Sequence, residues 1–277
     1  LFGFVPYGPQ QRSATDIAVF LGAAVPAYGA AELKNSADAG RKKLRLFLAD
    51  LPSSHSYDES VIQPTAKTLG LDVKIIYYDA ASADWNALAT TALADKPDES
   101  GSPSAQEADC LGFIQGLRGS GFTGPIFAAA CNQFIATVGA QAVGVQTYSE
   151  FWLPSVPEAA PPQAQLELKQ YEEQMTGSGN KDLINGFAGF TFAAAVNFAR
   201  GMQANLKGDP TGVNILTALH AIKDMPGFLH GNLTCDGSVW KGETSCTAGV
   251  LIYEVVAGGG RKLVSKGFID ASVFAPK

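Results

Sequence analysis

Short apolar runs alternate along the chain with segments whose apolar residues recur at helical spacing. Residues 44–49 and 73–78 are runs rich in apolar and β-branched side chains, and they predict strands of a buried sheet. Between them, residues 59–69 place their apolar side chains on one face of a helix. Gly70 is expected to end that helix, because glycine adopts the left-handed conformation at little cost. The order strand, polar loop, helix, strand predicts an α/β fold built on a parallel sheet.

The same alternation predicts the remaining elements. Further strands are expected over residues 17–22, 125–130 and 144–148, and a closing β-hairpin with a glycine turn is expected over residues 251–264. Helices are expected over residues 25–39, 85–94, 104–118, 163–175, 182–206 and 212–224. Asp84 is the expected N-cap of the helix that follows it, because its carboxylate can accept hydrogen bonds from the first turn.

Two segments interrupt this alternation of strands and helices. Residues 155–162 are rich in proline and predict a connection. Residues 96–103 are polar throughout, although the alternation calls for another strand there. Either a loop replaces that strand or residues are absent from the chain.

Composition narrows the class of protein. The chain has 277 residues, 46% apolar and 17% charged, which is typical of one large or two ordinary globular domains. Its net charge of −6 argues against a nucleic-acid partner, because phosphate binding needs clustered Lys and Arg. No continuous apolar stretch of the sequence reaches the ~18 residues of a membrane-spanning helix.

The four cysteines are an even number, and neither a C-x-x-C motif nor a neighbouring histidine gives them the spacing of a metal site. Two disulfides are the favoured interpretation, and four buried thiols are the alternative. Cys110 and Cys131 flank a predicted helix and strand, while Cys235 and Cys246 flank a short loop, but the pairing stays open at this point. Disulfides would place the protein outside the cytosol.

No motif predicts catalysis, a metal or a cofactor. Residues 119–124 match G-x-G-x-x-G, yet these glycines follow a helix and precede a strand, whereas a dinucleotide needs the reverse order. The chain has no G-x-S-x-G motif, and the serines next to His55 are adjacent in sequence, where a catalytic triad rarely forms. His55, His220 and His230 are too scattered in sequence to predict a metal site.

Polar side chains do gather after the predicted strands. Asp50 and the hydroxyl-rich residues 52–57 follow one strand, residues 131–133 follow a second, and residues 148–150 with Trp152 follow a third. In an open parallel sheet, ligands sit beyond the carboxyl ends of the strands. Helix N–H groups attract a carboxylate, and acidic or aromatic side chains attract an ammonium group. The sequence therefore predicts a site for a small zwitterion at this edge.

The order of elements resembles one known family, the type I periplasmic binding proteins of ABC transporters, in the branched-chain amino-acid group. The resemblance extends from about Ile17 to Lys262 and is carried by the order of its segments. The best-matching segments are KKLRL at 42–46 leading into Asp50 and Tyr57, LGFIQGLRGSGFTGPI at 111–126, the long helix at 186–202, and DMPGF at 224–228 with Gly231. The cysteines resemble those of actinobacterial members.

The resemblance implies two Rossmann-like lobes that close on a ligand by hinge motion. It assigns residues 1–40 to the remainder of the first lobe and 41–150 to the second lobe. Residues 151–210 would return to the first lobe, and 211–277 would supply the crossing and terminal hairpin of the second. The implied protein captures an amino acid or related small polar solute between its lobes and delivers it to a membrane permease. We expect a non-catalytic monomer without a cofactor, secreted or lipid-anchored outside the cell membrane.

The chain departs from the family in two places. The amino-terminal part of the first lobe has no counterpart, which predicts an incomplete first lobe, and the strand after Pro97 is missing. The absent part normally supplies Ser and Thr residues that hold the amino acid. The ligand residues carried over therefore come from the second lobe, and they are Ser54, Tyr57, Asn132, Tyr148 and Trp152.

Two other functions compete with solute delivery. A ligand-sensing receptor domain could have the same fold, but no fused kinase or DNA-binding segment is present to support it. A hydrolase or oxidoreductase on a Rossmann-like scaffold is the second alternative, since fold does not fix function. That alternative needs a nucleophile–base pair or a correctly ordered glycine loop, and the sequence has neither.

Overall fold

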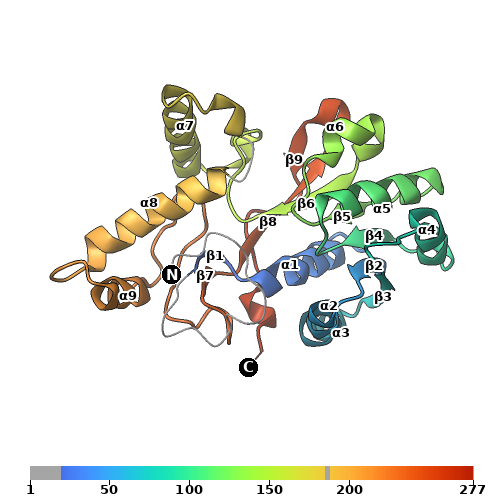
Figure 1. The fold of residues 1–277 in the computed structure, drawn as a ribbon, viewed down its shortest axis with the longest axis horizontal. Helices are drawn as coiled ribbons and strands as arrows, with labels where there is room; N and C mark the ends of the chain where they lie inside the picture. Colours follow the sequence, from blue (N-terminus) through green and yellow to red (C-terminus); the bar gives the residue numbers. More distant parts are fainter. Residues whose placement is uncertain (1–19, 185–187, 277) are drawn as a thin grey trace. The chain divides into compact units, whose positions relative to one another are not determined.

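The computed structural model describes residues 20–184 and 188–276, and its chain forms two compact units (Figure 1). Among the described residues, unit 1 combines 20–27, 150–184, 188–251 and 267–276, and unit 2 combines 28–149 and 252–266. These boundaries differ from the predicted lobe ranges, because residues 28–40 fall in unit 2 and residues 211–251 fall in unit 1.

Unit 2 is built on a sheet with the strand order β8–β6–β5–β4–β2–β3, in which β6, β5, β4, β2 and β3 are parallel. Its strands are β2 (Lys43–Ala49), β3 (Asp72–Tyr78), β4 (Glu99–Ser102), β5 (Ile126–Ala128), β6 (Val145–Ser149) and β8 (Gly249–Val255), which begins in unit 1. β9 (Arg261–Leu263) pairs antiparallel with β8, and this pair confirms the predicted hairpin. The helices are α1 (Val25–Asp38), α2 (Pro52–Tyr57), η2 (Asp58–Ile62), α3 (Gln63–Leu69), α4 (Trp85–Leu93), α5 (Glu107–Gly119) and α6 (Phe134–Val138), followed by the turn η3 (Gly139–Ala142).

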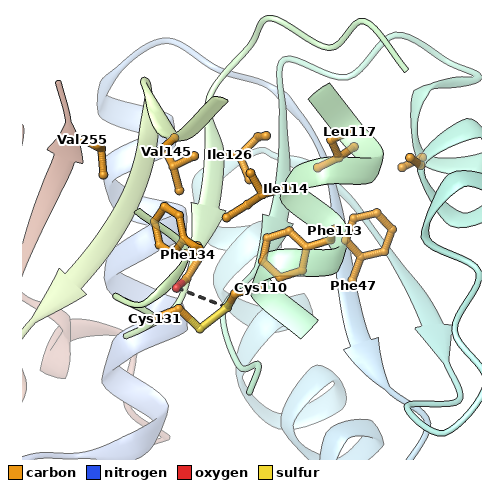
Figure 2. Close-up of a cluster of buried hydrophobic side chains, with 14 of the residues drawn as sticks. Phe47, Cys110, Phe113, Ile114, Leu117, Ile126, Cys131, Phe134, Val145 and Val255 are labelled. Atoms are coloured by element: carbon orange, nitrogen blue, oxygen red, sulfur yellow. Dashed lines mark hydrogen bonds between the residues drawn. A yellow bond between two sulfur atoms is a disulfide. The ribbon is translucent and has the colours of Figure 1, made fainter. Parts of the chain in front are cut away.

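Helices cover both faces of the unit 2 sheet (Figure 1). Successive side chains of a strand point to opposite faces, so Leu44 and Leu46 of β2 pack with Leu33 of α1 and Ile62 of η2. Phe47 points the other way, into a cluster that α4, α5 and α6 share with the strands. Figure 2 shows this second cluster with Phe113, Ile114 and Leu117 of α5 and Phe134 of α6.

The expectation of a loop or a gap at residues 96–103 is wrong, because β4 occupies the place that the alternation required. β4 is polar and yet wholly buried, and each of its polar side chains makes at least one hydrogen bond inside the protein. The Ser100 hydroxyl donates to the Arg45 carbonyl oxygen at 2.7 Å. The Glu99 carboxylate accepts hydrogen bonds from Arg41 at 2.7 Å and Ser36 at 2.5 Å. Internal partners thus replace the apolar pattern that usually marks a buried strand.

The helix predicted over residues 59–69 begins earlier, at Pro52, and continues through a π-helical segment, η2. Proline suits a first helical turn because it has no N–H that would need a partner there. The predicted end at Gly70 is confirmed by its left-handed φ of 65° and ψ of 38°. Asp84 likewise caps α4 as predicted, since its carboxylate accepts from the backbone N–H groups of Asn86 and Ala87.

Unit 1 packs helices against a short parallel pair of strands, β1 (Phe20–Ala23) and β7 (Ser245–Thr247). Its helices are α7 (Pro162–Gly177), α8 (Ala188–Asn205) and α9 (Gly212–His220), with short turns η4 (Pro157–Ala159) and η5 (Lys181–Leu183). The chain closes with the short strand β10 (Ile269–Asp270) and the turn η7 (Ala271–Phe274). The predicted strand at 17–22 lies partly outside the described residues, as do three residues of the predicted helix at 182–206. Within the described residues, no helix has the length and apolarity to cross a bilayer.

Both predicted disulfides are present, one in each unit. Cys110 and Cys131 join the start of α5 to the loop after β5 inside the unit 2 cluster (Figure 2). Cys235 and Cys246 join the two sides of a loop in unit 1, within the cluster formed with α8 and α9. The structure therefore settles the pairing that the sequence left open.

His230 is the buried titratable group that makes unit 1 sensitive to acid. Neither of its ring nitrogens has a hydrogen-bond partner within the described parts of the chain, and the rings of Phe151 and Phe190 lie beside it. Burial lowers the pKa of His230 from 6.5 to about 4. As the pH falls from 6.5 to about 4, His230 binds a proton in the unfolded chain but stays neutral in the folded unit. Acid therefore favours unfolding, by on the order of 3 kcal/mol.

We expect His230→Leu to flatten the acid side of the pH–stability profile, because leucine fills the same space without taking up a proton. Urea unfolding of unit 1 at a series of pH values measures this, with His220→Leu as the control for loss of an imidazole in the same unit. An acid side as steep in His230→Leu as in the wild type would contradict the prediction.

Candidate functional site

The parallel strands of unit 2 place their carboxyl ends at one edge of the sheet. Four of the five predicted ligand residues belong to segments at this edge. Ser54 and Tyr57 lie on the helix that follows β2, Asn132 lies in the loop after β5, and Tyr148 lies near the end of β6. The topology therefore places these four residues at the edge that the sequence predicted.

Tyr57 is held by the start of α1. Its hydroxyl oxygen accepts a hydrogen bond from the backbone N–H of Gly29 at 3.0 Å. Burial raises the pKa of the Tyr57 hydroxyl, and the nearby Tyr148 and Glu32 raise it further. The phenol is therefore neutral, and its O–H proton is available as a donor to a solute or a protein acceptor.

Tyr148 presents a stacked aromatic surface. Its ring lies on the ring of Tyr28 with centroids 4.2 Å apart and planes 4° from parallel. Its backbone N–H donates to the carbonyl oxygen of Ala129 at 3.0 Å. Ala129 has a positive φ of 44°, which is unusual for a residue other than glycine and recurs at ligand sites. The pair of tyrosines can hold an apolar or cationic group by ring contact.

Ser54 and Asn132 differ in their exposure and in the hydrogen bonds that they make within the protein. Ser54 is half-buried in the first turn of α2, where its backbone N–H donates to Leu51. Asn132 is exposed, but its amide group donates to the carbonyl oxygen of Ala130 at 2.7 Å and accepts from Arg261 of β9. Asn132 therefore ties the β5 loop to the closing hairpin, and a solute would have to share or break these bonds.

Trp152 belongs to unit 1 and lies in its core. Its indole packs edge-on against Phe268 with centroids 5.3 Å apart, and its backbone N–H donates to Leu229 at 2.9 Å. Only 6% of the residue is exposed. Its role as a ligand residue stays a prediction.

Sequence reasoning missed a chain of polar contacts at the end of β2. His55 Nε2 and the Asp50 carboxylate lie 2.7 Å apart, and the His55 ring stacks on Tyr77 at 3.9 Å. The Tyr77 hydroxyl donates to Asp58, and burial together with this carboxylate raises the pKa of Tyr77 to about 12. The five-residue spacing from Asp50 to His55 across a helix start is the signal that could have found the pair. The pair by itself does not make a hydrolase, which also needs a nucleophile within reach of the histidine.

Unit 1 contains a separate hollow of about 1430 Å³, lined by the end of α9, residues 231–242 and the carboxyl-terminal residues. The carboxylates that line it have partners within the unit. Asp224 accepts from Asn232, Asp236 from Ser238 and Lys223, and Asp270 from the backbone N–H of Ser272. Among the described residues that line the hollow, no carboxylate is left without a partner to select a ligand. No group of three His, Cys, Asp or Glu side chains within residues 20–184 and 188–276 is placed to hold a metal.

Comparison with known proteins identifies the class to which this fold and site belong. The periplasmic binding protein family matches residues 14–247. The chain therefore belongs to that family, whose members bind substrates and are not enzymes. No curated protein matches the chain.

Solved structures confirm the type I fold at low sequence identity. A leucine binding protein from Thermotoga maritima is 17% identical with a TM-score of 0.73, and the match covers 95% of this chain and 71% of that one. A branched-chain amino acid ABC transporter periplasmic ligand-binding protein from Burkholderia xenovorans is 12% identical with a TM-score of 0.76, covering 99% and 72%. A fatty acid ABC transporter substrate-binding protein from Thermomonospora curvata is 15% identical with a TM-score of 0.69, covering 95% and 72%.

Proposed function

We propose that this protein is the extracytoplasmic solute-binding component of an ABC transporter. It holds a small solute at the carboxyl-terminal edge of the unit 2 sheet and presents it to a membrane permease. The observation that carries the proposal is membership of the periplasmic binding protein family over residues 14–247, in a chain whose strand ends bear hydroxyl and aromatic groups. The two disulfides support a location outside the cytosol.

The proposed solute contacts in unit 2 are Ser54, Tyr57, Asn132 and Tyr148. Ser54 and Tyr57 supply hydroxyl groups, Asn132 supplies an amide and Tyr148 supplies a ring face. Such a set suits a small molecule with one polar end and one apolar end. Relatives of similar fold are named for leucine, branched-chain amino acids and fatty acids, and each of these ligands has a polar end and an apolar end.

The proposal is tested by titration calorimetry with Ser54→Ala and Ser60→Ala. Both serines lie on the same helix, but the Ser60 hydroxyl is exposed and donates to the Ser56 carbonyl oxygen. We expect Ser54→Ala to weaken binding of the identified solute about fivefold, because one hydrogen bond contributes about 1 kcal/mol. Ser60→Ala should bind as the wild type does. Equal affinities of the wild type and both variants would contradict the placement of the solute at this helix.

The proposed assembly is a monomer that meets its permease only when the solute is delivered. Light scattering of the purified chain measures the first part. A stable dimer would contradict it.

A further inference from the structure

Helix α1 carries a buried carboxyl group that has no counter-ion of its own. Glu32 is wholly buried, and within the described residues neither of its carboxyl oxygens has a hydrogen-bond partner. A buried polar group without a partner is rare in native proteins, because its desolvation is not compensated. The packing around Glu32 therefore does not explain why this position carries a carboxyl group.

The cations of α1 and of the neighbouring polar network already form ion pairs with other carboxylates. Arg41, in the turn after α1, bonds to Glu99 of β4 at 2.7 Å. Lys262 of β9 bonds to Glu254 of β8 at 2.8 Å. On α1 itself, the exposed Lys34 pairs with Asp38. Three buried or half-buried carboxyl groups thus share two cations on this face of the sheet, and Glu32 is the one left over.

Neutral polar groups link the other members of this cluster into a network. Gln146 of β6 donates to Glu254 at 3.0 Å and accepts from Asn35 at 3.2 Å and Arg41 at 3.3 Å. Burial raises the pKa of Glu99, and the bonds from Arg41 and Ser36 offset part of that rise. Glu32 has no such donor, and burial followed by the charge of Glu99 raises its pKa well above the usual range, although Arg41 opposes this. Glu32 is therefore the carboxyl group that keeps its proton.

The same turns of α1 hold the two tyrosines of the candidate site. Tyr28, four residues before Glu32, stacks on Tyr148, and Gly29 donates its N–H to the Tyr57 hydroxyl. The Tyr57 hydroxyl is close enough to both the Glu32 carboxyl and the Tyr148 hydroxyl to interact with each electrostatically. A displacement of α1 would break the contact that each tyrosine makes with it.

We propose that Glu32 is a proton-dependent latch that fastens α1 to the unit 2 sheet. Uncharged, its carboxyl group is tolerated under the helix. Ionised, it is a buried charge without a partner, and the helix must lift to hydrate it, which releases Tyr28 from Tyr148 and Gly29 from Tyr57. The titratable and charged groups that act on Glu32 are Glu99, Arg41 and Tyr57, and Gln146 connects Arg41 to the ion pair of Glu254 with Lys262.

The direction of the pH effect follows from where the proton is held. An unfolded glutamate loses its proton near pH 4.5, whereas the folded unit keeps it to a higher pH. As the pH rises above 4.5, the unfolded or opened state sheds a proton that the closed state retains, so opening of α1 becomes more favourable. The latch is therefore closed in acid and weakened in alkali. Its effect on solute binding rests on the proposed function, but its effect on α1 does not.

The test is hydrogen exchange of α1 in the whole protein, read by mass spectrometry at about pH 5 and about pH 8 and corrected for the chemical exchange rate. We expect Glu32→Gln to protect α1 several-fold better than the wild type at the higher pH and to match it at the lower pH, because the glutamine amide carries no charge at either pH. Asp38→Asn is the matched control: it removes the ion pair with Lys34 at the end of α1 and leaves the Glu32 network intact, so any change in protection of α1 should be the same at both pH values. Glu32→Leu repeats the test with an apolar side chain if the glutamine variant does not fold.

Equal protection of α1 in the wild type and Glu32→Gln at the higher pH would overturn the latch, as would lower protection in the variant. The exchange experiment needs no solute, so a wrong proposed function does not affect its outcome. A protected α1 in Glu32→Gln combined with a solute affinity that does not change with pH in the wild type would keep the latch and remove its link to the site.

Discussion

Gly101→Ala is expected to cost unit 2 about 4 kcal/mol or more, which is at the upper end of single-substitution effects. Gly101 lies in the middle of β4 with a φ of 138°, a conformation that favours glycine. A Cβ atom there would lie 2.5 Å from the backbone nitrogen of Phe127. β4 is paired on both sides, with β2 and β5, so the strand cannot shift away. Urea unfolding of the variant measures the loss.

Gly121→Ala separates backbone strain from the clash. Gly121 also has a positive φ, of 82°, but a Cβ atom at this position would meet no other atom within 4 Å. We expect this control to cost about 1–2 kcal/mol, the usual penalty for a left-handed residue that carries a Cβ atom. If the two variants lost the same stability, close packing of β4 on β5 would not be the reason for glycine at position 101.

Removing either disulfide is the second large effect that we expect, and each should weaken one unit. Cys110→Ala with Cys131→Ala opens a link across 21 residues in unit 2, and Cys235→Ala with Cys246→Ala opens one across 11 residues in unit 1. On the chain-entropy account, each double variant loses about 3 kcal/mol, with the longer loop losing slightly more. Hydrogen exchange assigns each loss to its unit.

Reduction of the wild-type protein is the matched control, since it opens both links and keeps all four side chains. The cysteines are nearly or wholly buried, so the alanine variants also lose packing, and the reduced wild type separates the two contributions. Unfolding midpoints that stay unchanged on reduction would contradict a stabilising role for either link.

The hydrophobic pattern predicted the fold well where burial is apolar, and it failed where burial is polar. β2 and β3 stand where their runs predicted, because their side chains enter apolar clusters. β4 was not predicted, because Glu99 and Ser100 are buried with polar partners supplied by residues distant in sequence. Such partners become visible only once the sheet is assembled.

The sequence likewise predicted only part of the candidate site. The strand-end rule brought Tyr57 and Tyr148 to one edge of the sheet, since that rule depends only on strand direction. It could not show that Asn132 is held by Arg261, or that Trp152 packs in unit 1. Glu32 was also missed, although it stands among apolar residues on a predicted helix, a position where a carboxyl group is out of place.

The central claim is that this chain binds a small solute and leaves it unchanged. The most direct test is a thermal-shift panel of amino acids, fatty acids, amides and sugars, followed by recovery of each hit and its mass. A solute present at about 100 times its dissociation constant should stabilise the folded protein by about 2.7 kcal/mol. We expect a hit that is recovered with its mass unaltered. A hit recovered as a different molecule would contradict it, because the protein would then be an enzyme.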